Sequence, residues 1–129
     1  MNSFEQIADY FEHIVALLDS CRVVQSHNIQ PRQRTMTEGY QRGEVLFTDE
    51  TRLHFRELVS VDPSVQLVSY AYQYMRKDGG LIFRYDDTDH FPNLPTAPHH
   101  KHVGEIEVIA ANAPDLQSVL KEIEALIKD

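Results

Sequence analysis

The chain has 129 residues, enough for one domain with a hydrophobic core that needs neither disulfides nor a structural metal. Its composition, 42% hydrophobic and 25% charged, is that of a globular protein, and no apolar run reaches the roughly 20 residues of a membrane span. The net charge of −8 argues against indiscriminate nucleic-acid binding, because contacts with phosphates need Lys and Arg.

The negative charge is concentrated at the two ends of the chain. Residues 1–20 contain four acids and no Lys or Arg, residues 103–129 contain six acids and two Lys, and the middle of the chain is neutral overall. This separation is compatible with a phosphate-bearing ligand in the middle and equally with a basic partner at the ends. With Cys21 as the single cysteine and no basic region at the start, we expect a cytoplasmic protein.

The first predicted element is a helix near the start of the chain. Ser3 followed by Gln6 is typical of a capping box. Apolar residues then recur at helical spacing, as Ile7, Phe11, Ile14, Val15 and Leu18. The pattern predicts an amphipathic helix with one face toward the core.

After this helix the hydrophobic period changes from 3.6 to 2, which predicts strands. The candidate strands are Arg22–Gln30, Tyr40–Thr48, Arg52–Val59, Val65–Arg76, Leu81–Tyr85 and Glu105–Ala110. Short turns connect the second to the fifth of them, at Asp49-Glu50, Asp62-Pro63-Ser64 and Asp78-Gly79-Gly80. Such connections join only antiparallel neighbours, so we predict an antiparallel meander of about five to six strands.

The last predicted element is a second amphipathic helix, with Pro114 in its first turn. Its apolar stripe is formed by Leu116, Val119, Leu120, Ile123, Leu126 and Ile127. Two terminal helices around a meander predict the α+β class, with both helices packed on one face of the sheet. We expect a single domain over residues 1–129.

The strand Val65–Arg76 places several large side chains on one face, namely Val68, Tyr70, Tyr72 and Tyr74. Arginines of neighbouring strands are Arg42, Arg52, Arg56 and Arg84. The tyrosines and arginines together could bind nucleic-acid bases and phosphates, or form a dimer interface. Tyrosine also often lines a half-buried sheet face, so a purely structural role stays open.

Histidines and charged residues are concentrated in residues 83–103, which we call the histidine segment. It contains four histidines (His90, His99, His100, His102), three aspartates (Asp86, Asp87, Asp89), Arg84, Lys101 and three prolines. Because proline fixes φ and lacks a backbone donor, we predict an irregular loop rather than a strand or helix. So much imidazole, with a pKa of about 6.5, points to chemistry near neutral pH.

Three roles are open for this segment. Two histidines and a cation can cleave a phosphodiester by general acid–base catalysis. His-x-His with a nearby aspartate can instead hold a divalent metal ion, although the spacing matches no specific metal motif. Finally, the histidines and aspartates can simply hydrogen-bond a proline-rich loop to itself.

Three stretches of the chain resemble one known family, the TumE-type toxins of bacterial toxin–antitoxin modules. They are GYQRGEVLFTDETRLHFRE (39–57), YAYQYMRKDGGLIFRYDD (70–87) and PNLPTAPHHKHV (92–103), and one departure is Ala97, where a larger residue is usual. The motif positions carried over are Tyr40, Arg42, Tyr70, Arg84, Tyr85, Asp86, His90, Pro98, His99, His100, Lys101 and His102. The resemblance implies a cytoplasmic toxin that acts on RNA or translation and has a cognate antitoxin encoded beside it.

Combined with the residue inventory, the resemblance leads to a ribonuclease hypothesis. His100 or His102 acts as general base, and His90 or His99 acts as general acid. On an extended backbone His100 and His102 share one face, and Lys101 shares the other with His99.

The remaining candidates hold the substrate or orient a histidine. Lys101 with Arg84 binds the scissile phosphate, and Asp86 orients a histidine tautomer. The predicted substrate-binding residues are Arg84, Tyr85, Arg42, Tyr40, Tyr70 and Tyr72. No cofactor is required, although a divalent metal would fit the histidines.

Two other functions stay open. One is a non-catalytic protein that docks on a partner through its tyrosines, and the other is a metal-dependent hydrolase that uses the histidines. The expected partners are the antitoxin, through the acidic helices, and RNA; a homodimer through the sheet edge or the tyrosines is a further expectation.

Overall fold

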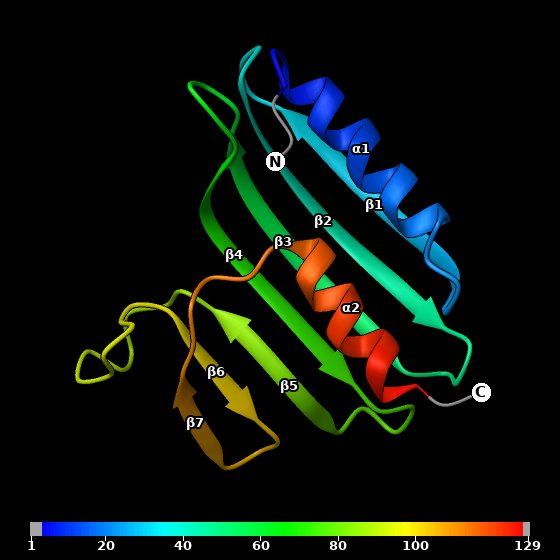
Figure 1. Cartoon of the computed structure of the whole chain (residues 1–129), viewed down its shortest axis with the longest axis vertical. Helices are drawn as coiled ribbons and strands as arrows, with labels where there is room; N and C mark the ends of the chain where they lie inside the picture. The colour runs from blue at the N-terminus through cyan, green and yellow to red at the C-terminus, as the bar shows by residue number, and fades with distance from the viewer. Residues whose placement is uncertain (1–3, 128–129) are drawn as a thin grey trace.

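The computed structural model describes residues 4–127, which form two helices and one seven-stranded antiparallel sheet (Figure 1). The elements in chain order are α1 (Ile7–Asp19), β1 (Val24–Gln33), β2 (Glu38–Phe47), β3 (Arg52–Ser60), β4 (Gln66–Met75), β5 (Leu81–Asp86), β6 (His100–Val103), β7 (Glu107–Ala110) and α2 (Leu116–Leu126). The strands lie beside one another in chain order, so every neighbouring pair is antiparallel. The α+β class and the meander are therefore confirmed, with seven strands instead of five to six.

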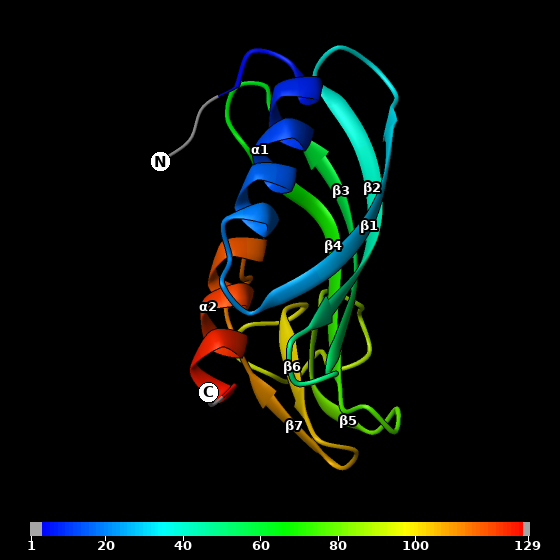
Figure 2. The ribbon, with the colours of Figure 1, turned by 90° about the vertical axis from the view of Figure 1, so that its right-hand side faces the viewer.

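Both helices lie on one side of the sheet, which leaves the other side, here called the open face, without a helix (Figure 2). The strand β3 illustrates the consequence, because its residues alternate between the two sides. Leu53, Phe55 and Val59 are buried under the helices, whereas Arg52 and His54 are exposed on the open face. The core thus lies between the sheet and the two helices.

The helix ends differ from the predictions. The N-cap of α1 is Gln6, which makes no side-chain capping hydrogen bond, and the predicted capping residue Ser3 lies outside the described residues. The N-cap of α2 is Asp115, which forms a capping box with Ser118. Pro114 therefore precedes α2, and its predicted place in the first turn is wrong.

The helix α1 lies very close to β2. A Cβ atom built on Gly39 would lie only 2.7 Å from Cζ of Phe11, so glycine is needed at this point of the strand. No helix among residues 4–127 has the length and apolar character needed to cross a membrane.

The tyrosines of β4 do not lie on the open face. Tyr70, Tyr72 and Tyr74 point toward the helices and are at most 1% exposed. A β-bulge near Val68, where Val59 pairs with Leu67 and not with Val68, changes the alternation at the start of the strand. The prediction of an exposed tyrosine surface for bases or for a partner is therefore wrong.

The histidine segment is irregular only in its middle. Its first residues belong to β5, as the candidate strand Leu81–Tyr85 predicts, and its last four belong to β6, where the prediction of an irregular loop is wrong. The prolines all lie between these strands, which leaves the His100–Val103 backbone free to pair with both neighbours. Thr96 holds the loop down, since its Oγ1 donates to the His99 carbonyl (2.7 Å) and accepts from the Ala111 N–H (3.0 Å).

Candidate functional site

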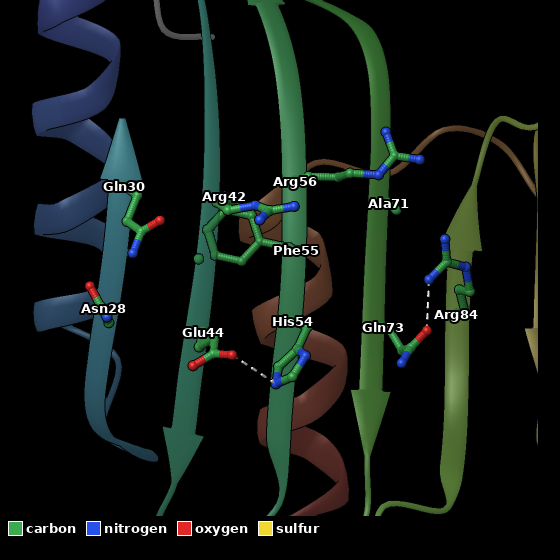
Figure 3. Close-up of a pocket in the computed structure, with 11 residues that line it drawn as sticks. Asn28, Gln30, Arg42, Glu44, His54, Phe55, Arg56, Ala71, Gln73 and Arg84 are labelled. Atoms are coloured by element: carbon green, nitrogen blue, oxygen red, sulfur yellow. Dashed lines mark hydrogen bonds and ion pairs between the residues drawn. The ribbon is translucent and has the colours of Figure 1, made fainter. Parts of the chain in front are cut away.

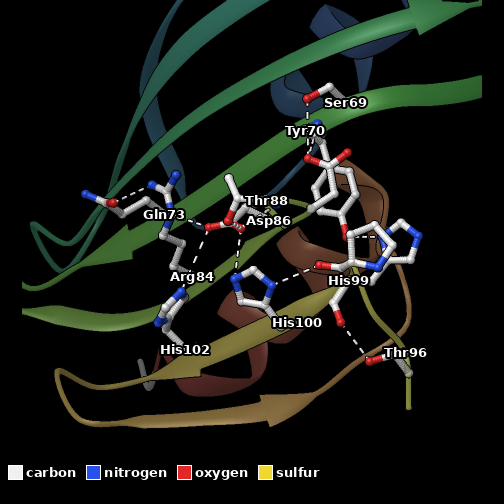
Figure 4. Close-up of polar contacts among 12 residues, drawn as sticks. Ser69, Tyr70, Gln73, Arg84, Asp86, Thr88, Thr96, His99, His100 and His102 are labelled. Atoms are coloured by element: carbon white, nitrogen blue, oxygen red, sulfur yellow. Dashed lines mark hydrogen bonds and ion pairs between the residues drawn. The ribbon is translucent and has the colours of Figure 1, made fainter. Parts of the chain in front are cut away.

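The pairing of β5 with β6 brings the polar residues of the histidine segment together. Asp86 pairs with His100 and Arg84 pairs with His102 across the two strands. Residues that are paired or two apart share one face of a sheet, and these four side chains share the open face (Figure 4). The predicted common face for His100 and His102 is thereby confirmed.

Asp86 is the centre of these contacts and is 3% exposed. Its Oδ2 accepts from Nε of Arg84 at 2.7 Å, and its Oδ1 accepts from the N–H and Oγ1 of Thr88 at 3.0 and 2.8 Å. Burial alone would raise the pKa of Asp86, but these donors and the nearby His100 hold that pKa below its ordinary value. Asp86 is therefore a carboxylate at neutral pH.

His100 lies behind Asp86 and is 1% exposed. Its Nδ1 is 3.0 Å from the carbonyl oxygen of Pro98, and its Nε2 is 2.9 Å from Oδ1 of Asp86. This second contact is close enough for an ion pair but is not aligned as a hydrogen bond. Nε2 is thus one of two buried side-chain atoms among the described residues that have no hydrogen-bond partner, the other being Oε1 of Gln41.

His102 is the histidine of this group that solvent can reach, with a side chain 27% exposed. Its Nε2 is 3.9 Å from Oδ2 of Asp86. Partial burial and the neighbouring His100 lower the pKa of His102, which favours the neutral imidazole. The ring of Phe91, with centroid distances of 4.8 Å to His100 and 5.7 Å to His102, packs against both histidines.

We call Asp86, His100 and His102 the Asp–His cluster. One donor atom from each of them lies within 4.8 Å of the others, so these are residues that could hold a metal ion. A carboxylate and two histidines can also move protons. The distances therefore allow two of the predicted chemistries at the same place.

A cavity of about 470 Å³ lies on the same open face, across β1 to β5 (Figure 3). Its polar lining residues are Asn28, Gln30, Arg42, Glu44, His54, Arg56, Gln73 and Arg84. Figure 3 shows these side chains on the side of the sheet turned away from the helices. We call this depression the arginine cavity, because three guanidinium groups line it.

Arg84 connects the arginine cavity to the Asp–His cluster. Its Nη1 donates to Oε1 of Gln73 at 2.6 Å, while its Nε donates to Asp86 at 2.7 Å. The guanidinium is therefore held between a cavity residue and the central carboxylate. An anion in the cavity would lie beside the cluster.

Several predicted site residues lie on the helix side instead. Lys101 is tied to α2, since its Nζ is 2.6 Å from Oε2 of Glu122, and it lies 4.9 Å from the ring centroids of Phe83 and Tyr85. The hydroxyl of Tyr85 donates to Oε1 of the same Glu122 at 2.7 Å. These contacts hold Lys101 and Tyr85 away from the cluster.

His99 and the tyrosines of β4 also face the helices. Nδ1 of His99 is 2.9 Å from the hydroxyl of Tyr70, and the two rings stack. Figure 4 shows His99 turned toward Tyr70, away from Asp86. Tyr72 is fully buried, so neither tyrosine offers an exposed ring on which a base could stack.

The remaining predictions fall near the open face. His90 is exposed in the loop, with its ring 6.5 Å from that of Phe91, and its charge contributes to lowering the pKa of His102. Arg42 lines the arginine cavity. Tyr40 lies two residues before Arg42 on β2, opposite Leu58.

Sequence reasoning did not assign site roles to His54, Gln73 or Thr88, whereas Arg56 was named among the arginines that could contact phosphates. The alternation along β3 and β4 indicated the faces of His54 and Gln73, because both interleave with the apolar residues of the core. Thr88 had no such signal, since it follows the end of β5 and reaches Asp86 from the loop.

Comparison with known proteins gives one match. The model of a protein family described as Toxin TumE matches residues 13–127, nearly the whole chain. No curated protein and no solved structure matches the chain. The matched range includes the arginine cavity and the complete Asp–His cluster.

Proposed function

Because this chain belongs to the TumE toxin family, we propose that it is the toxin of a toxin–antitoxin module and that it cleaves RNA on its open face. The single observation that carries this proposal is the position of Arg84. This residue joins a cavity lined by cations to a cluster of one carboxylate and two histidines. Phosphate binding and proton transfer would thus occur side by side.

The arginine cavity accounts for the binding of RNA. Arg42, Arg56 and Arg84 would contact phosphates, and guanidinium groups suit phosphate oxygens because they donate two parallel hydrogen bonds. The amides of Asn28, Gln30 and Gln73 could hydrogen-bond base edges or ribose. The local positive charge explains how a chain with a net charge of −8 can bind an anion.

The Asp–His cluster accounts for the chemistry. In RNA cleavage the attacking hydroxyl oxygen bonds to phosphorus while the bond from phosphorus to the leaving oxygen breaks. The step needs a group that takes the proton from the attacking hydroxyl, a proton for the leaving oxygen, which water would supply here, and a cation that offsets the charge developing on the phosphate. His102 is the exposed member of the cluster and would meet the substrate, while Asp86 and the buried His100 would hold it in place. Arg84 would offset the charge.

The proposal is tested with purified protein and single-stranded RNA, together with inducible expression in bacteria. We expect His102→Ala to lose cleavage by at least about 100-fold and to lose growth arrest. His99→Ala is the matched control, because it removes a histidine of the same segment that contacts Tyr70 and not Asp86. Unchanged cleavage by the His102 variant, or growth arrest without any RNA cleavage, would refute the proposal.

The acidic helix α1 is the surface we assign to the antitoxin. Its exposed acids Asp9, Glu12 and Asp19 lie on the opposite side of the sheet from the arginine cavity. A basic antitoxin segment that folds on binding would suit this surface. Charge reversal at Asp9 and Glu12 should weaken antitoxin binding and leave RNA cleavage unchanged.

A further inference from the structure

The donor atoms of the Asp–His cluster lie close to the separations expected around one ion. Nε2 of His100 and Oδ1 of Asp86 are 2.9 Å apart, and Nε2 of His102 and Oδ2 of Asp86 are 3.9 Å apart. Two donors bound to the same zinc ion at about 2.1 Å can be at most about 4.2 Å apart. Both separations fall within that limit. The three donor atoms together lie within 4.8 Å of one another, so binding would draw them closer by up to about 0.6 Å.

The buried Nε2 of His100 gives the second and independent indication. A carbonyl oxygen only accepts hydrogen bonds, so the contact with Pro98 uses Nδ1 of His100 as a donor. Nε2 is left without a hydrogen-bond partner and faces a carboxylate oxygen at 2.9 Å inside a side chain that is 1% exposed. A buried polar atom without a partner needs an explanation, and a cation held between this nitrogen and the carboxylate supplies one.

We infer that Asp86, His100 and His102 bind one divalent transition-metal ion. Two imidazoles and one carboxylate form a donor set of zinc, manganese and iron(II) sites, whereas magnesium and calcium prefer oxygen donors. Because His102 is partly exposed, solvent could supply a further ligand.

The surroundings of the cluster are those of a metal site. Metal-binding histidines commonly donate their other ring N–H to a backbone carbonyl, as His100 does to Pro98. Ligating carboxylates are themselves hydrogen-bonded, as Asp86 is by Thr88 and Arg84. The guanidinium of Arg84 opposes a second cation, so the affinity should be lower than in a site without such a neighbour.

Metal binding itself does not depend on RNA cleavage, but its use as a catalyst rests on the proposed function. A metal at this place would activate a hydroxyl or polarise a phosphate oxygen. His102 would then act as a ligand and not as the base. Chelation therefore separates the two mechanisms.

The experiment is a calorimetric titration of chelator-treated protein with ZnCl₂, followed by the same titration with MgCl₂. We expect one zinc equivalent per chain with no comparable response to magnesium. His102→Ala and Asp86→Asn should each weaken zinc binding by at least about tenfold, whereas His99→Ala and His90→Ala should not change it. Equal zinc binding by the wild type and both cluster variants would overturn the inference, and so would an equal response to magnesium.

A parallel RNA-cleavage assay with and without chelator distinguishes this inference from the proposed function. Loss of cleavage on chelation, with recovery on adding zinc or manganese, supports both. Cleavage that persists in chelator, together with no zinc binding, overturns the metal site and leaves the ribonuclease proposal in place. Tight zinc binding without any cleavage of RNA supports the site and refutes the ribonuclease proposal.

Discussion

Two buried carboxylates lie on opposite faces of the same sheet, and their surroundings differ in kind. Glu57 on β3 faces the helices and is fully buried. Three uncharged donors surround it, one each from α1, β2 and β4: Tyr10 (2.7 Å), Gln41 (2.8 Å) and Tyr72. Burial raises the pKa of Glu57, and the three hydrogen bonds only partly oppose that effect.

Asp86 on β5 faces the other way and has charged or titratable neighbours. Arg84, His100 and His102 lie around it, its pKa is lowered, and one buried nitrogen beside it has no hydrogen-bond partner. Arg84 also lines the arginine cavity.

Burial of a carboxylate therefore does not by itself indicate a functional site. Glu57 has neutral donors and a closed environment, which is an arrangement that holds a helix to a sheet. Asp86 has ionisable partners, an unfilled bonding position and access to a cavity, which is an arrangement suited to binding and proton transfer. Four predictions test this contrast.

The largest effect should follow from Glu57→Ala, which leaves three buried donors without an acceptor. We expect the free energy of unfolding to fall by about 3 kcal/mol or more, measured by urea denaturation. RNA cleavage per folded molecule should not change, because Glu57 lies on the helix side. A stable variant without cleavage would reverse the roles that we assign to the two carboxylates.

The second effect concerns RNA affinity in the arginine cavity. The double variant Arg42→Gln and Arg56→Gln should bind single-stranded RNA at least about tenfold more weakly, with a shallower salt dependence, because each guanidinium would neutralise one phosphate. Arg76→Gln is the matched control, since Arg76 pairs with Asp78 at an exposed hairpin. If the control weakened binding as much as the double variant, the cavity would not be the binding surface.

The third effect is a pH dependence of stability. The pKa of Glu57 is raised in the folded state above its ordinary value of 4.5, so the unfolded chain ionises first as the pH rises. The free energy of unfolding of the wild type should therefore fall above about pH 4.5 relative to Glu57→Gln, by about 1.4 kcal/mol for each unit of pKa difference. Urea denaturation of both proteins at several pH values measures this difference. If the stability difference between the two proteins did not change with pH, the pKa of Glu57 would not be raised in the folded state.

The smallest effect is expected for Lys101, which we first assigned to phosphate binding. Its ion pair with Glu122 is half-buried, so Lys101→Met should lower the stability by about 1 kcal/mol or less, as thermal denaturation would measure. Cleavage and RNA affinity should remain those of the wild type. A large loss of cleavage at unchanged stability would instead support the phosphate-binding role first predicted for Lys101.

Local sequence patterns predicted most of the fold. Six of the seven strands were placed within a few residues, because their alternation and their turns are local signals, as at Asp78-Gly79-Gly80, where Gly79 has a φ of 90°. The strand β6 was missed because Pro92, Pro95 and Pro98 lie just before it, although none of them is part of the strand. A short strand after a proline-rich loop has no pattern of its own, and only its neighbours β5 and β7 make it a strand.

The sequence predicted which residues belong to the candidate site but not how these residues are arranged. Asp86, Arg84, His100 and His102 were all named, and the shared face of the two histidines followed from their spacing. Lys101, His99 and Tyr70 were named with them and lie on the helix side. The cavity residues His54 and Gln73 come from strands far away in the sequence, so no local pattern connected them to the cluster.

Side-chain alternation in a strand is a property of the local backbone, so the residue pattern was enough to predict which residues share a face of each strand. Which of the two faces the helices cover depends on tertiary packing. The helices cover the face that carries the tyrosines around Glu57, and the arginines lie on the uncovered face. The physical reason is that burial depends on the packing of whole elements, and the pairing of β5 with β6 across a long loop then set the distances among Asp86, His100 and His102.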